Sequence, residues 1–314
     1  MVSMKQRIYF PNDFFQGEVR EGFFVEKKMK CAWAAQLEVL AEIDRICKKH
    51  GIRYFADSGT LLGAIRHKGF IPWDDDVDIS MLRDEYRRFF YVAPKELPEG
   101  WQILDLNHGS EQLFGRITNG DTYDSRAERL LEFHGCPYVV GVDIFPVDYV
   151  PKVREEEDVW YLTLKYLYGV IYQLRVENEN AMLKGTMNLE NELRRIEELC
   201  NVKINRTENI NAQLIKLTDR MLQIYGKEDA GALELAACDL RRGWRYRYQI
   251  DSYEQSIEIP FENIMIPVPI GYKDVLNALF GENYMTPIRG TMGHEYPFYK
   301  KQDLKLEEMR NNML

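Results

Sequence analysis

The chain has 314 residues, of which 45% are hydrophobic and 29% are charged, a composition typical of a globular protein with a sizeable core. Its formal net charge of −9 argues against a protein that coats nucleic acid, so we expect no nucleic-acid partner, and an anionic ligand needs local cations. The five cysteines are widely spaced and include no Cys-x-x-Cys pair. This pattern favours a reduced, cytoplasmic protein without a thiolate zinc site.

The N-terminal stretch "MVSMKQRIYFPNDFF" becomes polar at Pro11, where a signal peptide needs an uninterrupted apolar run, so we expect no export signal. The most apolar later segment, residues 161–174, contains Lys165 and is shorter than the ~20 residues that a helix needs to span a bilayer. The sequence therefore predicts no integral membrane segment.

The first half of the chain alternates between helical and strand patterns. Apolar residues at three- and four-residue spacing predict a helix over about 25–50, which Gly51 ends. The segment "IRYFAD" predicts a short strand, "SGTLLGAIRH" a helix, "DVDISM" a strand and "RDEYRRFFYVAPKEL" a helix, followed by strands in "WQILDL", "LFGRIT" and "YVVGVDIF". We therefore expect an α/β (α+β) catalytic core with an N-terminal helix over 1–150.

The second half changes character after Pro151. Long charged helical patterns occupy roughly 154–180, 187–200 and 207–249 without strand signals, which predicts a mainly helical lobe over 151–255. Strand character returns near 256 in "SIEIPFENIMIPVP", and the helical "YKDVLNALFG" follows. The segment 256–314 is expected to pack back on the core.

Four aspartates in five positions stand out in "GFIPWDDDVDISM". If "DVDISM" is a strand, Asp76 and Asp78 point to the same face while Val77 faces the core. Two carboxylates on one face suit Mg²⁺ or Mn²⁺ and leave positions for water and substrate phosphate. The alternative is a polar turn, and for Asp74 and Asp75 we expect capping or solvated positions.

A third acid could complete a two-metal site. Asp143 is the lone charge in the apolar strand from Tyr138 to Val147, and a buried lone carboxylate is costly unless it is paired or bound to a metal. Asp148 follows Pro146, where we expect the strand to end in a turn or cap. Asp143 is therefore the stronger candidate.

The segment Ser58-Gly59-Thr60 falls at the start of a predicted helix. Backbone N–H groups at a helix start, small residues that permit close approach and a threonine hydroxyl can cradle phosphate oxygens. The same tripeptide is also an ordinary helix cap. The acid pair on the strand that follows favours the phosphate site.

The runs "DSGTLLGAIRHKGFIPWDDDVDISMLRDEY", "VVGVDIFPVD" and "PVPIGYKDVLNALFGENYMTP" closely resemble the LicD family of phosphocholine transferases, whose relatives include fukutin and the fukutin-related protein. The resemblance covers about 35–150 strongly and about 260–300 moderately. It implies a nucleotidyltransferase-like mixed sheet flanked by helices. Family members usually carry Gly-Gly-Thr where this chain has Ser58, a change that could alter how closely the backbone approaches a phosphate.

The resemblance implies metal-dependent transfer of a phosphoryl alcohol, typically phosphocholine from CDP-choline, to a sugar hydroxyl of a cell-surface glycan or teichoic acid precursor, with release of CMP. Asp76 and Asp78 would hold Mg²⁺ or Mn²⁺ on the donor pyrophosphate. Asp143 would complete the second metal position or accept the proton of the sugar hydroxyl. The expected substrate-binding residues are Ser58, Gly59, Thr60, Arg66, Lys68, Arg116 and His294.

Several alternatives stay open. The cationic side chains of Arg66, Lys68 and Arg116 could instead be solvated or paired with the aspartates. An Asp-x-Asp sugar-nucleotide glycosyltransferase also uses such acids, and a non-catalytic relative would keep the fold without turnover. Trp73 could pack in the core or offer a ring face to a quaternary ammonium group. The basic and aromatic segment 241–253 could bind an anionic glycan or form a solvated helix face.

Overall fold

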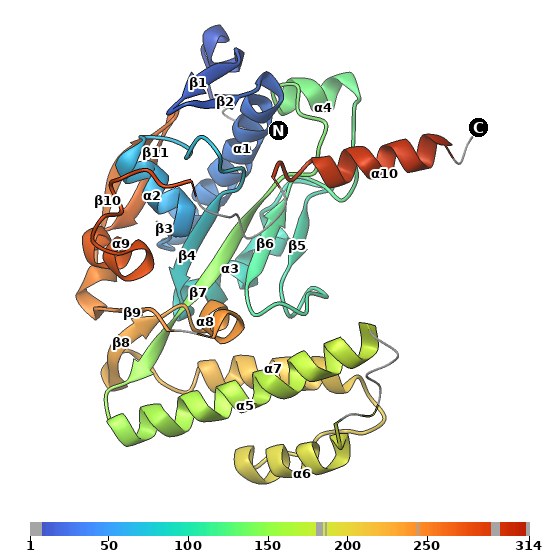
Figure 1. Cartoon of the computed structure of the whole chain (residues 1–314), viewed down its shortest axis with the longest axis vertical. Helices are drawn as coiled ribbons and strands as arrows, with labels where there is room; N and C mark the ends of the chain where they lie inside the picture. The colour runs from blue at the N-terminus through green and yellow to red at the C-terminus, as the bar shows by residue number, and fades with distance from the viewer. Residues whose placement is uncertain (1–7, 180–184, 186, 244, 290–295, 312–314) are drawn as a thin grey trace. The chain divides into compact units, whose positions relative to one another are not determined.

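The computed structural model describes residues 8–179, 185, 187–243, 245–289 and 296–311 (Figure 1). Helices hold 49% of the described residues and strands 17%, and the strands form a curled mixed sheet flanked by helices, which confirms the α/β prediction. Nowhere in these described ranges is there a helix with both the length and the apolar character needed to cross a bilayer.

The chain forms two compact units. The first contains Met1–Leu104, Gly115–Phe145 and Asp251–Leu314, and the second contains Asp105–Phe114 and Pro146–Ile250. The first unit holds β1 (Glu18–Arg20), β2 (Phe23–Val25), α1 (Lys27–His50), β3 (Phe55–Ala56), α2 (Ser58–Arg66), β4 (Asp78–Leu82), α3 (Arg83–Val92), β5 (Gln102–Leu104), β6 (Gly115–Thr118), α4 (Ala127–Glu132), the start of β7 (Gly141–Pro151), β10 (Ser256–Phe261), β11 (Ile264–Pro269), α9 (Tyr272–Phe280) and α10 (Lys300–Asn311).

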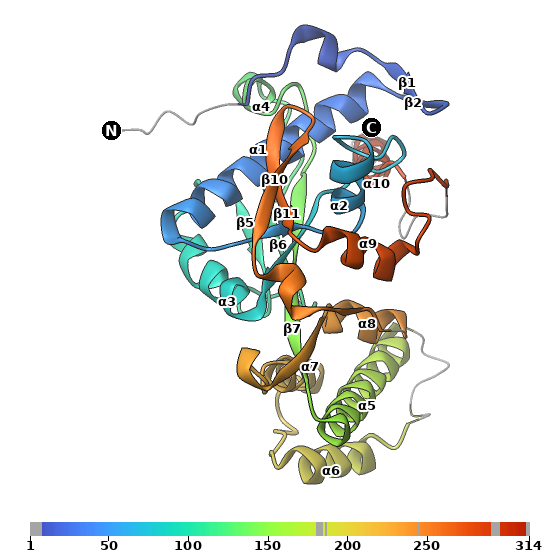
Figure 2. The ribbon, with the colours of Figure 1, turned by 90° about the vertical axis from the view of Figure 1, so that its left-hand side faces the viewer.

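The sheet of the first unit has the strand order β3-β4-β7-β6-β5 (Figure 1). Strands β3 and β4 are antiparallel, with Phe55 opposite Ser80, and β6 and β7 are antiparallel, with Arg116 opposite Asp143. The hairpin of β10 and β11 contacts β3 and α2, and Figure 2 shows it beside α2. Strands β1 and β2 form a separate hairpin that the sequence analysis missed.

Helix α1 confirms the predicted helix over about 25–50. Its apolar residues are buried, among them Leu37, Leu40 and Ile43. Gly51 ends the helix in the left-handed conformation, with a φ of 59°, and its N–H bonds to the carbonyl oxygen of Cys47. Glycine adopts this conformation without the steric cost that other residues incur.

The second unit holds the end of β7, α5 (Arg154–Glu179), α6 (Leu189–Cys200), α7 (Ile210–Leu222), β8 (Ala230–Glu234), α8 (Ala236–Arg242) and β9 (Arg247–Tyr248). Its core packs α5 against α6 and α7 around Trp160, Leu164 and Leu214. The prediction of one helix over 207–249 is wrong, because β8 and β9 lie within that range and pair antiparallel. Pairing of β8 with β7, and of β9 with β8, decides the conformation of these short segments, whose local pattern is helical.

The expected end of the strand at Pro146 is also wrong. Strand β7 continues to Pro151, and Asp148 is fully buried opposite Glu234 of β8. Pro146 falls between Ile144, the last residue paired with β6, and Asp148, the first paired with β8. Its missing N–H therefore removes no hydrogen bond from either ladder.

Candidate active site

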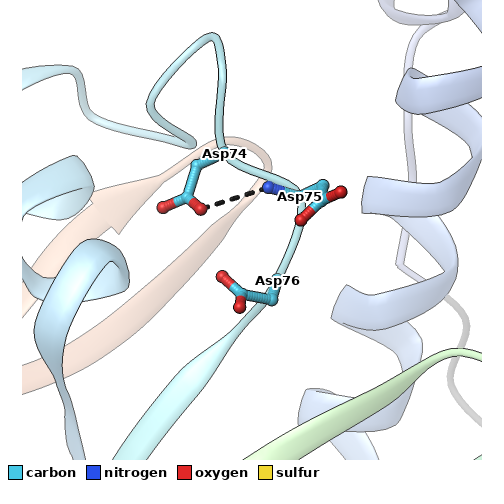
Figure 3. A group of neighbouring side chains, drawn as sticks. All are labelled: Asp74, Asp75 and Asp76. Carbon is cyan, nitrogen blue, oxygen red and sulfur yellow. Dashed lines mark hydrogen bonds between the residues drawn. The ribbon is translucent and has the colours of Figure 1, made fainter. Parts of the chain in front are cut away.

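The acid loop, residues 74–78, connects the end of a turn to strand β4. Among the residues that the structure describes, Asp74, Asp75 and Asp76 are the acidic group whose carboxylate oxygens lie within 4.8 Å of one another. Figure 3 shows the carboxylates of Asp74 and Asp76 on the same side of the loop, whereas Asp75 lies toward helix α1. The cluster therefore presents two carboxylates together and anchors the loop with the third.

Asp75 is fully buried, so the expectation of a solvated or capping position is wrong for this residue. Its Oδ2 accepts the backbone N–H of Phe298 at 2.6 Å, and its carbonyl oxygen accepts Nε2 of Gln36 at 2.8 Å. Trp33 Nε1 donates to the carbonyl oxygen of Asp74 at 3.0 Å. Helix α1 and the C-terminal segment thus hold the loop from residues far away in the sequence, a contribution that local pattern does not reveal.

The turn before the acid loop is also fixed by long-range contacts. Phe70 stacks on Trp33 with ring centroids 4.5 Å apart, and its N–H donates to Oε1 of Glu262 at 3.1 Å. Arg20 donates to both carboxylate oxygens of Glu262, at 2.6 and 3.2 Å. Stacking and charge-assisted hydrogen bonds at both sides of the turn restrict where Asp74 can lie.

The start of α2 packs directly against the acid loop. A Cβ atom on Gly59 would lie 2.3 Å from Oδ2 of Asp74, so a larger residue at this position would require the carboxylate of Asp74 or the helix start to shift. Thr60 is buried, and its Oγ1 accepts the backbone N–H of Asp78 at 2.9 Å. Ser58 has a φ of 46°, and its Oγ donates to Oδ1 of Asp57 at 3.0 Å. The Ser-Gly-Thr segment therefore packs against the acids and is hydrogen-bonded to them.

Strand β4 and its neighbour β7 place two further predicted acids. Asp78 begins β4, and both Asp76 and Asp78 are half-buried while Val77 between them is buried, as the predicted alternation requires. The N–H of Asp143 on β7 donates to the carbonyl oxygen of Val77 at 3.1 Å. Asp143 thus lies beside the acid loop, in the strand that neighbours it.

Burial and mutual repulsion dominate the electrostatics of this loop. Burial first, and then Asp76 and Asp75, raise the pKa of Asp74 well above its usual range. Burial also raises the pKa of Asp78, and the charges of Asp76 and Asp143 add to the effect. Like charges this close favour a bound cation, and carboxylate oxygens are the ligands that Mg²⁺ and Mn²⁺ prefer. The side chains present therefore fit a divalent metal ion.

The predicted cations occupy three different environments. Arg116 donates to both carboxylate oxygens of Asp143, with 2.7 Å between Nη2 and Oδ2. The Nη1 of Arg66 donates to the carbonyl oxygen of Tyr284 at 2.8 Å. Lys68 is exposed on the turn. The structure thus brings Arg116 to the acids and ties Arg66 to the segment after α9, while His294 lies outside the described residues.

Of the predicted metal ligands, Asp78 and Asp143 lie on the neighbouring strands β4 and β7, and Asp76 lies in the loop before β4. Among the described side chains, however, the acidic group whose oxygens lie within 4.8 Å of one another is Asp74 to Asp76. Sequence reasoning missed Asp74 as a member of the site because three consecutive aspartates also suit a turn. It also missed Asp57, which is buried and precedes the Ser-Gly-Thr segment. The apolar residues on both sides of the aspartates were the available signal that this loop is not a solvated turn.

Comparison with known proteins finds one family and two named transferases that this chain resembles. The family described as "LicD/FKTN/FKRP, nucleotidyltransferase domain" matches residues 51–168, which include α2, the acid loop and Asp143. The lipopolysaccharide cholinephosphotransferase LicD of Haemophilus influenzae is 28% identical over 254 residues, covering 80% of this chain and 89% of that protein. The ribitol 5-phosphate transferase FKRP of Homo sapiens is 36% identical over 55 residues, covering 18% of this chain and 11% of that protein.

The fold, the acid loop and these similarities define a transferase with a nucleotidyltransferase-type domain. Residues 51–168 of the chain match the LicD family, and most of the chain is similar to a LicD protein.

Proposed function

We propose that this enzyme transfers a phosphoryl alcohol, phosphocholine from CDP-choline, to a sugar hydroxyl of a cell-surface glycan or teichoic acid precursor and releases CMP. The observation that carries the proposal is the close approach of Gly59 to Asp74. It places the N-terminus of α2, where backbone N–H groups can bind phosphate, next to a cluster of carboxylates. The similarity to a cholinephosphotransferase and to a ribitol phosphate transferase supports the same reaction class. We infer that the enzyme works in the cytoplasm.

Asp76 and Asp78 would hold Mg²⁺ or Mn²⁺, with Asp143 as the third ligand or as the base. The metal ion, when bound, would neutralise charge on the pyrophosphate as the bond to CMP breaks. The backbone N–H groups at the start of α2 would orient phosphate oxygens, and Gly59 leaves room for them beside Asp74. Asp143 is held by Arg116, which keeps its carboxylate oriented toward one side of the sheet.

Lys68 and Arg116 would supply local positive charge to the nucleotide, which an acidic chain needs. Each charge-assisted contact is worth about 1.5 to 3 kcal/mol, and a solvated cation contributes roughly 0 to 1 kcal/mol. Calorimetric titration of CDP-choline and Mg²⁺ into Lys68→Ala and Arg116→Ala should therefore show affinities lower by about tenfold or more. Unchanged affinity in both variants would mean that other cationic residues bind the phosphates.

A donor panel tests the reaction itself. The purified chain is incubated with Mg²⁺, a glycan acceptor and, in turn, CDP-choline, CDP-ethanolamine, CDP-ribitol or CDP-glycerol, and CMP is measured by mass spectrometry. We expect CMP and a phosphoalcohol-modified glycan with CDP-choline, and neither with an Asp76→Asn control. Release of a nucleoside diphosphate from a sugar nucleotide would instead identify a glycosyltransferase.

A further inference from the structure

Three half-buried aromatic side chains gather beside the acid loop, and we call Phe23, Trp73 and Tyr296 the aromatic cluster. The ring centroid of Phe23 lies 6.3 Å from that of Trp73 and 5.6 Å from that of Tyr296. Both pairs are edge-to-face, with interplanar angles of 71° and 76°. The three rings come from β2, the turn directly before the acid loop and the C-terminal segment, so the fold assembles them from distant parts of the chain.

The aromatic cluster lies in the negative field of the acids. Trp73 directly precedes Asp74 in the chain. Burial raises the pKa of the Tyr296 phenol, and the charges of Asp75, Glu26 and Asp74 raise it further, which places these carboxylates close enough to act on the ring. A ring face carries a negative quadrupole, so ring faces and carboxylates at one place both favour a cation.

One protein cation already uses this surface. The guanidinium of Arg289 lies over the ring of Phe23, 4.6 Å from its centroid. Arg289 is exposed, so its side chain can exchange with another cation at little cost. The face of Phe23 therefore accommodates a positive group of the size of a guanidinium.

We propose that the aromatic cluster selects the donor by binding the quaternary ammonium group of choline. This inference rests on the proposed function, because it concerns the alcohol end of the same CDP-alcohol. The ammonium of phosphocholine is two carbons away from the phosphate oxygen, so a phosphate at the acid loop places it in the immediate neighbourhood. Ring faces offer few hydrogen bonds to the hydroxyl groups of ribitol or glycerol, and the aromatic cluster therefore disfavours neutral polyols.

The test compares CDP-choline with its neutral isostere, the CDP ester of 3,3-dimethylbutanol, in which carbon replaces the ammonium nitrogen. Phe23→Leu, Trp73→Leu and Tyr296→Leu are made one at a time, and the ratio of kcat/KM for the two donors is measured through CMP release. We expect this ratio to fall by about threefold to thirtyfold in each folded variant, the range of cation–π contacts. Phe24→Leu is the matched control, because Phe24 is the next residue of β2, points to the opposite face and is 62% exposed.

A second measurement separates this inference from the proposed function. Binding of both CDP esters is titrated by calorimetry in the presence of Mg²⁺, without an acceptor. In one outcome the wild type releases no CMP but binds CDP-choline more tightly than the neutral ester, and Phe23→Leu binds the two esters equally. The proposed function then fails and the inference stands. An equal loss for the cationic and neutral esters in the three variants, or an unchanged ratio, would overturn the inference and leave the rings with a packing role.

Discussion

Arg116 and Asp143 face each other directly across β6 and β7, and the guanidinium donates to both oxygens of the carboxylate. The hydrogen bond to Asp143 raises the pKa of Arg116 above its usual range. Sequence reasoning assigned one residue to the nucleotide and the other to the metal. The structure shows that each is also the partner of the other, so removing one changes the electrostatics of the second.

A double-mutant cycle measures this coupling. Arg116→Met should lower the free energy of unfolding by about 1 to 3 kcal/mol, because it leaves the carboxylate of Asp143 without its bidentate partner. The side chain of Asp143 is only 13% exposed, so water replaces that partner poorly. Asp143→Asn should cost less, and the double variant should cost less than the sum of the two. Denaturant unfolding gives the three values, and strict additivity would show that the pair contributes nothing to stability.

Gly59→Ala tests the contact between α2 and Asp74. The added methyl would lie 2.3 Å from Oδ2 of Asp74, so the carboxylate must rotate away or the loop must shift, and overpacking typically costs about 1 to 3 kcal/mol. We expect turnover to fall by roughly tenfold or more, because small displacements at a reacting centre are costly. Gly169→Ala in α5 is the control, since nothing lies within 4 Å of its added Cβ and a helical alanine should stabilise by ~0.5 to 1 kcal/mol. Wild-type turnover in Gly59→Ala would contradict the close approach.

Asp76→Asn and Asp78→Asn should each lower turnover by roughly a hundredfold or more, because the cation they would hold acts on the transition state. The fold should persist, since both side chains are half-buried and amides match the carboxylates in size. Circular dichroism checks the fold and CMP release checks the activity. Loss of helical signal in both variants would assign the two acids a structural role.

Binding of a divalent cation is expected to raise the melting temperature without any substrate. At a concentration one hundred times the Kd, a ligand that binds only the folded state stabilises it by ~2.7 kcal/mol. The shift with Mg²⁺ or Mn²⁺ should shrink in Asp76→Asn and persist in Asp121→Asn, an exposed acid in the same unit. Full activity after thorough EDTA treatment, together with identical shifts in the two variants, would argue against a metal at the acid loop.

The pH dependence of stability in the second unit should reflect Asp239. Burial raises its pKa to about 7, although the N–H of Tyr246 donates to Oδ2 at 2.8 Å. The usual value of ~3.9 applies to the unfolded chain, so the folded state binds the proton more tightly. This contribution is complete below about pH 4 and is lost as the pH rises through about 7.

The variant Asp239→Asn isolates this effect, because the amide oxygen can still accept the hydrogen bond and does not titrate. The stability of the wild type relative to the variant should fall between about pH 4 and about pH 7, by up to ~1.4 kcal/mol per pH unit in the middle of this range, and should level off above about pH 7. Urea unfolding at intervals across this range gives the difference. A constant difference would mean that Asp239 titrates at its ordinary pKa.

Local pattern was sufficient for α1, for the start of α2 and for the alternation of Asp76, Val77 and Asp78, because each depends on spacing within a few residues. It was insufficient for Asp75 and Asp148, whose burial depends on partners far away in the chain. Strand β8 was missed for the same reason, since pairing with β7 determines it. The pairing of Arg116 with Asp143 needs the register of two strands, which the sequence does not display.

The hydrogen bond from Phe298 to Asp75 also has a consequence for synthesis of the protein. The donor and the acceptor are 223 residues apart, and the acceptor is a carboxylate with no exposure to solvent. While the chain is being made, the acid loop leaves the ribosome long before this N–H exists. The loop can therefore complete its buried arrangement only after Phe298 has emerged. Contacts of such long range also slow folding, so assembly of the acid loop is a late event for every new copy of the protein.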